Sequence, residues 1–328
     1  MGWYDAVGRR AFFTMDAETA HRVAHRVLGL SLPWRRIGGA REDPSLATSL
    51  AGVVLRNPVG LAAGFDKTGA HVDALGRLGF GYVVTGTVTR AAREGNPRPR
   101  IVRYPERQAL VNAMGLPNPG AEAVAHTLIR RQRTCPRFVS VADEAIDDAL
   151  ETLALLAPHA DGIELNASCP NVAWGRDRDT EAHLRELVGG MRARTPKPLF
   201  VKLPPFDEGT GRDVVLALAR IAQEAGADGL TCGNTRLVED ARLAVGRGGL
   251  SGRPLWDRTV ASVAEVCEAT GGALAINACG GVFTTEDVAA CLDAGAVTVQ
   301  IYTALIYRGP GVVGDLTRGL VGPAATPR

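Results

Sequence analysis

The sequence predicts an α/β fold, a closed (β/α)8 barrel with an N-terminal helical extension. The length of 328 residues fits one barrel of roughly 250 residues plus an extension. From about residue 55 onward, short β-type runs alternate with amphipathic helical runs. Hydrophobic residues form 46% of the chain, which is enough for a large core. A doubly wound open parallel sheet is the alternative, because periodicity alone does not establish closure.

Eight β-type runs are the expected barrel strands, and helical patterns fill the intervals between them. The expected strands are 58–64, 81–88, 137–142, 162–168, 199–204, 229–234, 273–281 and 298–304. The clearest helical patterns are 145–160, 211–227 and 284–296. This order places residues 41–328 in one barrel domain.

Residues 1–40 form a separate segment with a different pattern. Apolar side chains recur at helical spacing, Asp16 is a candidate N-cap, and the opposite face is basic. The apolar positions are Ala20, Val23, Ala24, Val27 and Leu28, and the opposite positions are His21, Arg22, His25 and Arg26. Two interpretations stay open: a helical pair docked on the barrel, or an amphipathic contact with a membrane surface.

Composition excludes several classes of protein. The formal charge of +2 indicates no nucleic-acid partner. The six cysteines show no metal-ligand spacing, so we expect no metal site and reduced thiols in a cytosolic compartment. The sequence contains no run of 18 apolar residues, so we expect no helix that spans a membrane. The N-terminus carries charged residues within its first apolar stretch and does not resemble a signal peptide.

Polar residues recur at the carboxyl ends of the expected strands, where barrels carry their active sites. Lys202 lies in a strand otherwise built of apolar residues, and a buried ammonium must be paired or strongly perturbed. The Gly280-Gly281 turn and the turn after 298–304 suit a phosphate, although each is also an ordinary strand-to-helix turn. These residues together predict one site at one rim.

Four asparagines and one cysteine add chemistry to this rim. Converging amides suit a ring that bears alternating N–H and C=O groups. Cys169 is either a small buried hydrophobe or a proton acceptor in an exposed turn before Pro170. The asparagines are Asn112, Asn166, Asn171 and Asn234.

An ordered set of motifs resembles the dihydroorotate dehydrogenases, flavin enzymes of pyrimidine synthesis. The motifs span nearly the whole chain: NPVGLAAGFDKTG, GFGYVVTGTVT, GNPRPR, LVNAMGLPN, NASCPN, GGLSGRPL and VQIYTALIYRGPG. The N-terminal FFTMDAETAH resembles the extension of the membrane-associated, quinone-reducing class. The resemblance implies FMN as cofactor, dihydroorotate as substrate, quinone as electron acceptor, and a peripheral location on the cytoplasmic side of the cell membrane.

Carried over by position, the resemblance assigns roles to individual residues. Cys169 would remove a proton from dihydroorotate while hydride passes to FMN. FMN would be held by Ala63, Gly64, Lys67, Thr87, Ser140, Asn166, Lys202, Gly233, Gly252, Gly281, Tyr302 and Thr303. Substrate would contact Lys67, Asn112, Ala113, Met114, Gly115, Leu116, Asn166, Asn171, Asn234 and Thr235.

Some positions depart from the pattern of the quinone-reducing class. Cys169 stands where that class usually has Ser, Ser140 where it has Asn, and Gly233 where a Thr contacts flavin. An FMN-dependent paralogue that acts on another dihydropyrimidine or cyclic amide is therefore the alternative. A barrel that binds phosphate without redox chemistry and an inactive flavin-binding paralogue are further alternatives.

Overall fold

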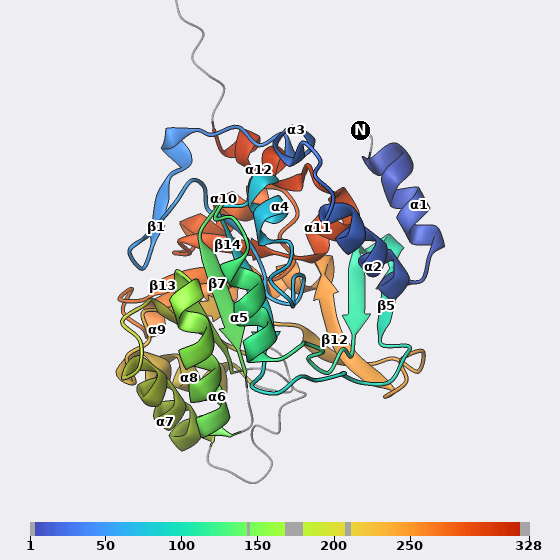
Figure 1. The fold of residues 1–328 in the computed structure, drawn as a ribbon. Coiled ribbons are helices and arrows are strands. Elements are labelled where there is room, and N and C mark those ends of the chain that lie inside the picture. Colours follow the sequence, from blue (N-terminus) through green and yellow to red (C-terminus); the bar gives the residue numbers. More distant parts are fainter. Residues whose placement is uncertain (1–3, 143–144, 168–179, 207–210, 322–328) are drawn as a thin grey trace, which may run out of the picture.

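The computed structural model describes residues 4–142, 145–167, 180–206 and 211–321 (Figure 1). Eight parallel strands close into a barrel in the order β3, β4, β7, β8, β9, β10, β13 and β14, and β14 pairs back onto β3. The barrel prediction is therefore confirmed, and the open-sheet alternative is wrong. The strands are β3 (Val59–Leu61), β4 (Tyr82–Val88), β7 (Arg137–Val141), β8 (Gly162–Asn166), β9 (Leu199–Lys202), β10 (Gly229–Cys232), β13 (Ala275–Cys279) and β14 (Thr298–Ile301).

Helices connect the barrel strands and cover the outside of the barrel, as α5 to α8 show in Figure 1. They are α4 (Val72–Arg77), α5 (Ala121–Ile129), α6 (Ile146–Leu156), α7 (Thr180–Arg192), α8 (Arg212–Glu224), α9 (Trp256–Ala269), α10 (Thr285–Asp293), α11 (Thr303–Arg308) and α12 (Val312–Leu320). The three helical patterns predicted from the sequence correspond to α6, α8 and α10. Thr284 and Asp287 begin α10 with a reciprocal capping box.

One end of the barrel is filled by aromatic rings. Each ring lies opposite a glycine in the neighbouring strand, and a Cβ on that glycine would approach the ring within 2.2–2.3 Å. The pairs are Tyr82 with Gly60, Phe138 with Gly162, and Phe200 with Gly229. The hairpin of β1 (Thr48–Leu50) and β2 (Val53–Leu55) adds buried Leu50 and Leu55 to this cluster.

A second, antiparallel sheet interrupts the barrel pattern. Its order is β11 (Arg236–Glu239), β12 (Arg247–Gly252), β6 (Ala109–Asn112) and β5 (Ile101–Tyr104). β5 and β6 follow barrel strand β4, and β11 and β12 follow barrel strand β10. Both insertions therefore extend from the carboxyl ends of barrel strands. The strands expected from the sequence did not include this sheet.

The N-terminal segment is helical and lies against β5 and α11 (Figure 1). A short π-helix (Tyr4–Gly8) precedes α1 (Arg9–Thr14), α2 (Ala17–Leu28) and α3 (Trp34–Gly38). The side chain of Asp16 accepts hydrogen bonds from the backbone N–H groups of Glu18 at 3.2 Å and Thr19 at 2.9 Å, so it caps α2 as predicted.

The predicted polar face of α2 is wrong for two of its four residues. Arg22 and Arg26 are exposed, but His21 and His25 turn toward the barrel. Both imidazoles contact the ring of Phe65, with centroids 5.5 and 5.2 Å away respectively. The docking of α2 against Phe65 reverses the assignment, because it gives both imidazole rings an aromatic ring to pack against.

Candidate active site

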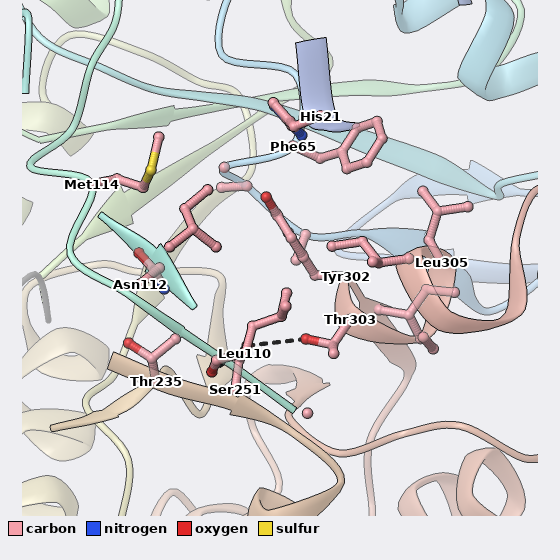
Figure 2. Close-up of a pocket in the computed structure, with 18 of the residues that line it drawn as sticks. His21, Phe65, Leu110, Asn112, Met114, Thr235, Ser251, Tyr302, Thr303 and Leu305 are labelled. Atoms are coloured by element: carbon pink, nitrogen blue, oxygen red, sulfur yellow. Dashed lines mark hydrogen bonds between the residues drawn. The ribbon is translucent and has the colours of Figure 1, made fainter. Parts of the chain in front are cut away.

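A cavity of about 780 Å³ extends from the N-terminal helices to the carboxyl ends of the barrel strands. α1 and α2 line one part of it, the four-stranded sheet lines another, and the barrel strands form its floor. This volume lies within the range of small-molecule sites. Figure 2 shows side chains from all three regions around the same space.

The part of the cavity next to α2 is mostly apolar, with His21 at its border. Small side chains of α2, including Ala20 and Ala24, border it. Phe65 and Tyr302 meet edge to face across the wall, with centroids 5.8 Å apart (Figure 2). Such a surface favours an apolar ligand over a charged one.

The floor of the cavity is polar. The Asn166 side-chain amide donates to Thr87 Oγ1 at 3.1 Å, and Thr87 Oγ1 lies 3.0 Å from Ser140 Oγ. Lys202 is 6% exposed and is hydrogen-bonded to the thiol of Cys279. Burial opposes its charge, but Cys279 and Glu164 outweigh that cost and raise the pKa of Lys202. Lys202 is thus a fixed cation at the floor.

A second lysine enters from the loop after β3. The Lys67 ammonium donates to the backbone oxygen of Gly64, and burial, followed by the charge of Arg100, lowers its pKa to about 8. The Asp66 carboxylate holds this loop by accepting from the backbone N–H groups of Thr68 at 3.2 Å and His71 at 2.8 Å. Lys67 is therefore positioned by its own loop.

Amide and hydroxyl side chains line the part next to the four-stranded sheet. The Asn112 side chain donates to the backbone oxygen of Gly249 at 3.3 Å, and Asn234 Oδ1 accepts from the backbone N–H of Thr235 at 2.8 Å. Asn112 and Thr235 lie on the same side of the cavity in Figure 2. These groups offer both donors and acceptors to a polar ring.

The structure gathers most of the residues chosen from the sequence. Ten of the twelve expected cofactor residues line the cavity: Ala63, Gly64, Lys67, Thr87, Asn166, Lys202, Gly252, Gly281, Tyr302 and Thr303. The expected substrate residues Asn112, Ala113, Met114, Gly115, Leu116, Asn234 and Thr235 also line it, together with Lys67 and Asn166. Cys169 and Asn171 lie outside the described residues.

Two expected cofactor residues do not line this cavity. Ser140 is fully buried behind Thr87, which lies between it and the cavity. Gly233 borders a separate pocket of about 30 Å³, and a Cβ at Gly233 would lie 2.1 Å from the backbone oxygen of Cys279. Ser140 therefore contacts Thr87, which lines the cavity, and does not line the cavity itself.

The sequence reading missed several residues that line the cavity. Ser251 accepts a hydrogen bond from the Thr303 hydroxyl at 3.1 Å (Figure 2). His21, Phe65, Cys279 and Gln300 are the other principal omissions. Cys279 directly precedes the Gly280-Gly281 turn, so its place at the end of an expected strand could have predicted a position at the site. Nothing in the sequence predicted the position of His21, because the direction of its side chain depends on where α2 docks.

Comparisons with known proteins agree with this architecture. The family model for dihydroorotate dehydrogenase matches residues 45–322. The chain is 36% identical to the dihydroorotate dehydrogenase (quinone) of Halorhodospira halophila, covering 98% of this chain and 99% of the relative. It is 37% identical to the protein of the same name from Bordetella pertussis, covering 96% of each.

Solved structures show the same relationship. A crystal structure of dihydroorotate dehydrogenase from Eimeria tenella in complex with ferulenol superposes with a TM-score of 0.82 at 30% identity. The match covers 93% of this chain and 90% of that one. The barrel, the cavity at its carboxyl end and these matches lead to one conclusion: the chain belongs to the dihydroorotate dehydrogenase family.

Proposed function

We propose that this protein oxidises (S)-dihydroorotate to orotate in pyrimidine synthesis, with FMN as redox cofactor and a quinone as electron acceptor. The observation that carries the proposal is the single cavity that joins an amide-lined part, a cationic floor and an apolar part under α2. A flavin enzyme with two unlike substrates needs these three environments in contact with one cofactor.

The residues present fit FMN. Lys202 supplies a buried positive charge for an electron-rich ring, and the Thr87–Asn166 pair supplies hydrogen-bonding groups beside it. Gly64 has a φ of +101°, and the nearest heavy atom to a Cβ there would be Cε2 of Tyr302 at 3.5 Å. The missing side chain leaves room for a flat ligand at the wall. FMN, when bound, supplies hydride acceptance.

The chain itself would bind, orient and deprotonate the substrate. Asn112 and Asn234 would fix the ring through amide donors and acceptors, and Lys67 would face its negative charge. We assign proton removal from C5 of dihydroorotate to Cys169, following the family resemblance. A thiol has an ordinary pKa of roughly 8.5, which suits proton transfer near neutral pH.

A quinone would enter under α2. Ala20 and Ala24 leave an apolar passage that ends at Phe65 and Tyr302, which border the proposed flavin site. Exposed apolar side chains lie along the same segment, with Leu30 55% and Leu32 38% exposed. We propose that this segment contacts the cytoplasmic side of the cell membrane peripherally. None of the helices in the described ranges has the length and apolar character needed to cross a bilayer.

An anaerobic titration tests the substrate. The protein loaded with FMN should lose its yellow colour on addition of dihydroorotate and keep it with dihydrouracil. Bleaching by dihydrouracil alone would favour the paralogue with another cyclic amide. Failure to retain FMN would contradict the flavin assignment itself.

Steady-state assays test the electron acceptor. Quinone, fumarate and NAD should be compared under the same conditions with the same preparation. We expect quinone to give the fastest turnover. Faster turnover with fumarate would contradict the quinone proposal while leaving the dihydroorotate proposal intact.

A further inference from the structure

A buried carboxylate lies in the barrel interior next to the floor of the cavity. Glu164 on β8 is 1% exposed and stands two residues before Asn166, so both side chains project from the same face of the strand. Asn166 pairs with Lys202 in the barrel register. We propose that Glu164 is a positioning residue that acts through Lys202 and makes the midpoint potential of bound FMN more negative. This inference rests on the proposed flavin function.

Hydrogen bonds hold the Glu164 carboxylate in place. Its Oε2 accepts from Thr231 Oγ1 at 2.8 Å and from Gln300 Nε2 at 3.0 Å. Thr231 in turn accepts from the Asn277 amide at 3.2 Å. Thr231 is also the register partner of Lys202 on the neighbouring strand. The carboxylate therefore lies in the same part of the barrel interior as the lysine.

Glu164 is the acidic side chain behind Lys202. Cys279 also favours the charge of Lys202, but burial raises the pKa of that thiol, so the carboxyl group of Glu164, the stronger acid of the two, supplies the countercharge. Coulombic attraction between Lys202 and Glu164 acts across a protein interior, where charges are weakly screened. The cavity floor thus carries one cation with a buried countercharge behind it.

The side chains of Glu164 and Gln300 each keep an oxygen atom that accepts no hydrogen bond from the described residues. Among the described residues, nothing donates to Glu164 Oε1 or to Gln300 Oε1, and both atoms are buried. Gln300 also lines the cavity, so the network continues from Glu164 to the ligand site.

The consequence for a bound flavin follows from charge. Two-electron reduction adds negative charge to the ring, which a nearby cation stabilises and a nearby anion destabilises. Glu164 offsets part of the field of Lys202. Removing the carboxylate charge would leave more of that field at the ring, and the reduced flavin would bind more tightly relative to the oxidised flavin.

The experiment measures the two-electron midpoint potential of FMN bound to the full chain. We expect Glu164→Gln to shift the potential to more positive values. A change of about tenfold in the ratio of the two affinities corresponds to about 30 mV for two electrons. Glu164→Met removes the charge without an amide and should shift the potential in the same direction.

Thr231→Val is the matched control. It removes the hydrogen bond to Glu164 and the one from Asn277, with little change in side-chain volume and none in charge, so it should retain the wild-type potential. Equal shifts in Thr231→Val and Glu164→Gln would indicate a packing role and overturn the inference. An unchanged potential in Glu164→Gln would also overturn the inference. The inference would be overturned as well if both Glu164 variants lost FMN binding while Thr231→Val still bound FMN. Wild-type protein that binds no FMN would instead refute the proposed function.

Discussion

Glu18 on α2 accepts a hydrogen bond from Arg100 at 2.8 Å, and both side chains are largely excluded from solvent. Arg100 precedes β5 and also donates to the backbone oxygen of Asn96 at 3.1 Å. The pair ties the N-terminal helices to the second sheet, 82 residues away in the chain. The apolar passage under α2 depends on this attachment.

Replacing Glu18 by Gln should loosen α2. The substitution leaves the buried charge of Arg100 without its carboxylate partner, so we expect the free energy of unfolding to fall by about 2 kcal/mol. Denaturant unfolding checks this value. Glu151→Gln, which breaks the more exposed pair with Arg90, is the control and should cost under about 1 kcal/mol. An equal loss in both variants would contradict the structural role of Glu18.

A bulky side chain in the apolar passage under α2 should slow the oxidation of the flavin by quinone without slowing its reduction by dihydroorotate. Ala24→Phe places a ring in the cavity beside α2, so quinone reduction should fall by about tenfold or more. Flavin reduction by dihydroorotate should change little, because the amide groups of Asn112 and Asn234 come from the four-stranded sheet and the end of β10, not from α2. Arg26→Phe adds a ring on the exposed face and is the control. Stopped-flow measurement of each half-reaction separates the effects, and equal loss in both halves would contradict the assignment.

Stability should fall as pH drops from about 6.5 toward 4. Burial, followed by the charge of His71, lowers the pKa of His25 to about 4, and Lys67 and Asp66 also act on it. The ring centroids of His21 and His71 lie 4.2 and 4.7 Å from that of His25, and both residues have lowered pKa values too.

Because the unfolded state takes up these protons first, stability is complete above pH 6.5 and declines below it. For His25 alone the loss is at most about 3 kcal/mol. Thermal unfolding at several pH values checks this decline. His25→Phe should flatten it, whereas an unchanged slope in that variant would contradict the attribution to His25.

Substitution of Cys169 tests the proposed base. Cys169→Ala should keep the yellow colour and substrate binding but lose flavin reduction by about 100-fold or more. Cys169→Ser should retain activity with its optimum moved to higher pH, because a hydroxyl is much less acidic than a thiol. Rapid-scan anaerobic reduction across pH provides the measurement. Wild-type rates in Cys169→Ala would remove Cys169 from the mechanism.

Local patterns determined the elements of this protein. Apolar runs such as 162–168 and 298–304 predicted barrel strands β8 and β14, and Asp16 predicted the start of α2. These features depend on side-chain alternation and capping, which act over a few residues. The isolated lysine in LFVKLP likewise indicated the floor of a site before any partner was known.

Tertiary structure decided which groups meet. Closure of the barrel brought Glu164 to Gln300, and docking of α2 turned His21 and His25 inward. The sheet of β5, β6, β11 and β12 was not visible in the sequence, because its strands come from two insertions more than 100 residues apart. Pairing across such distances depends on register and docking, which are long-range properties that no single run of residues encodes.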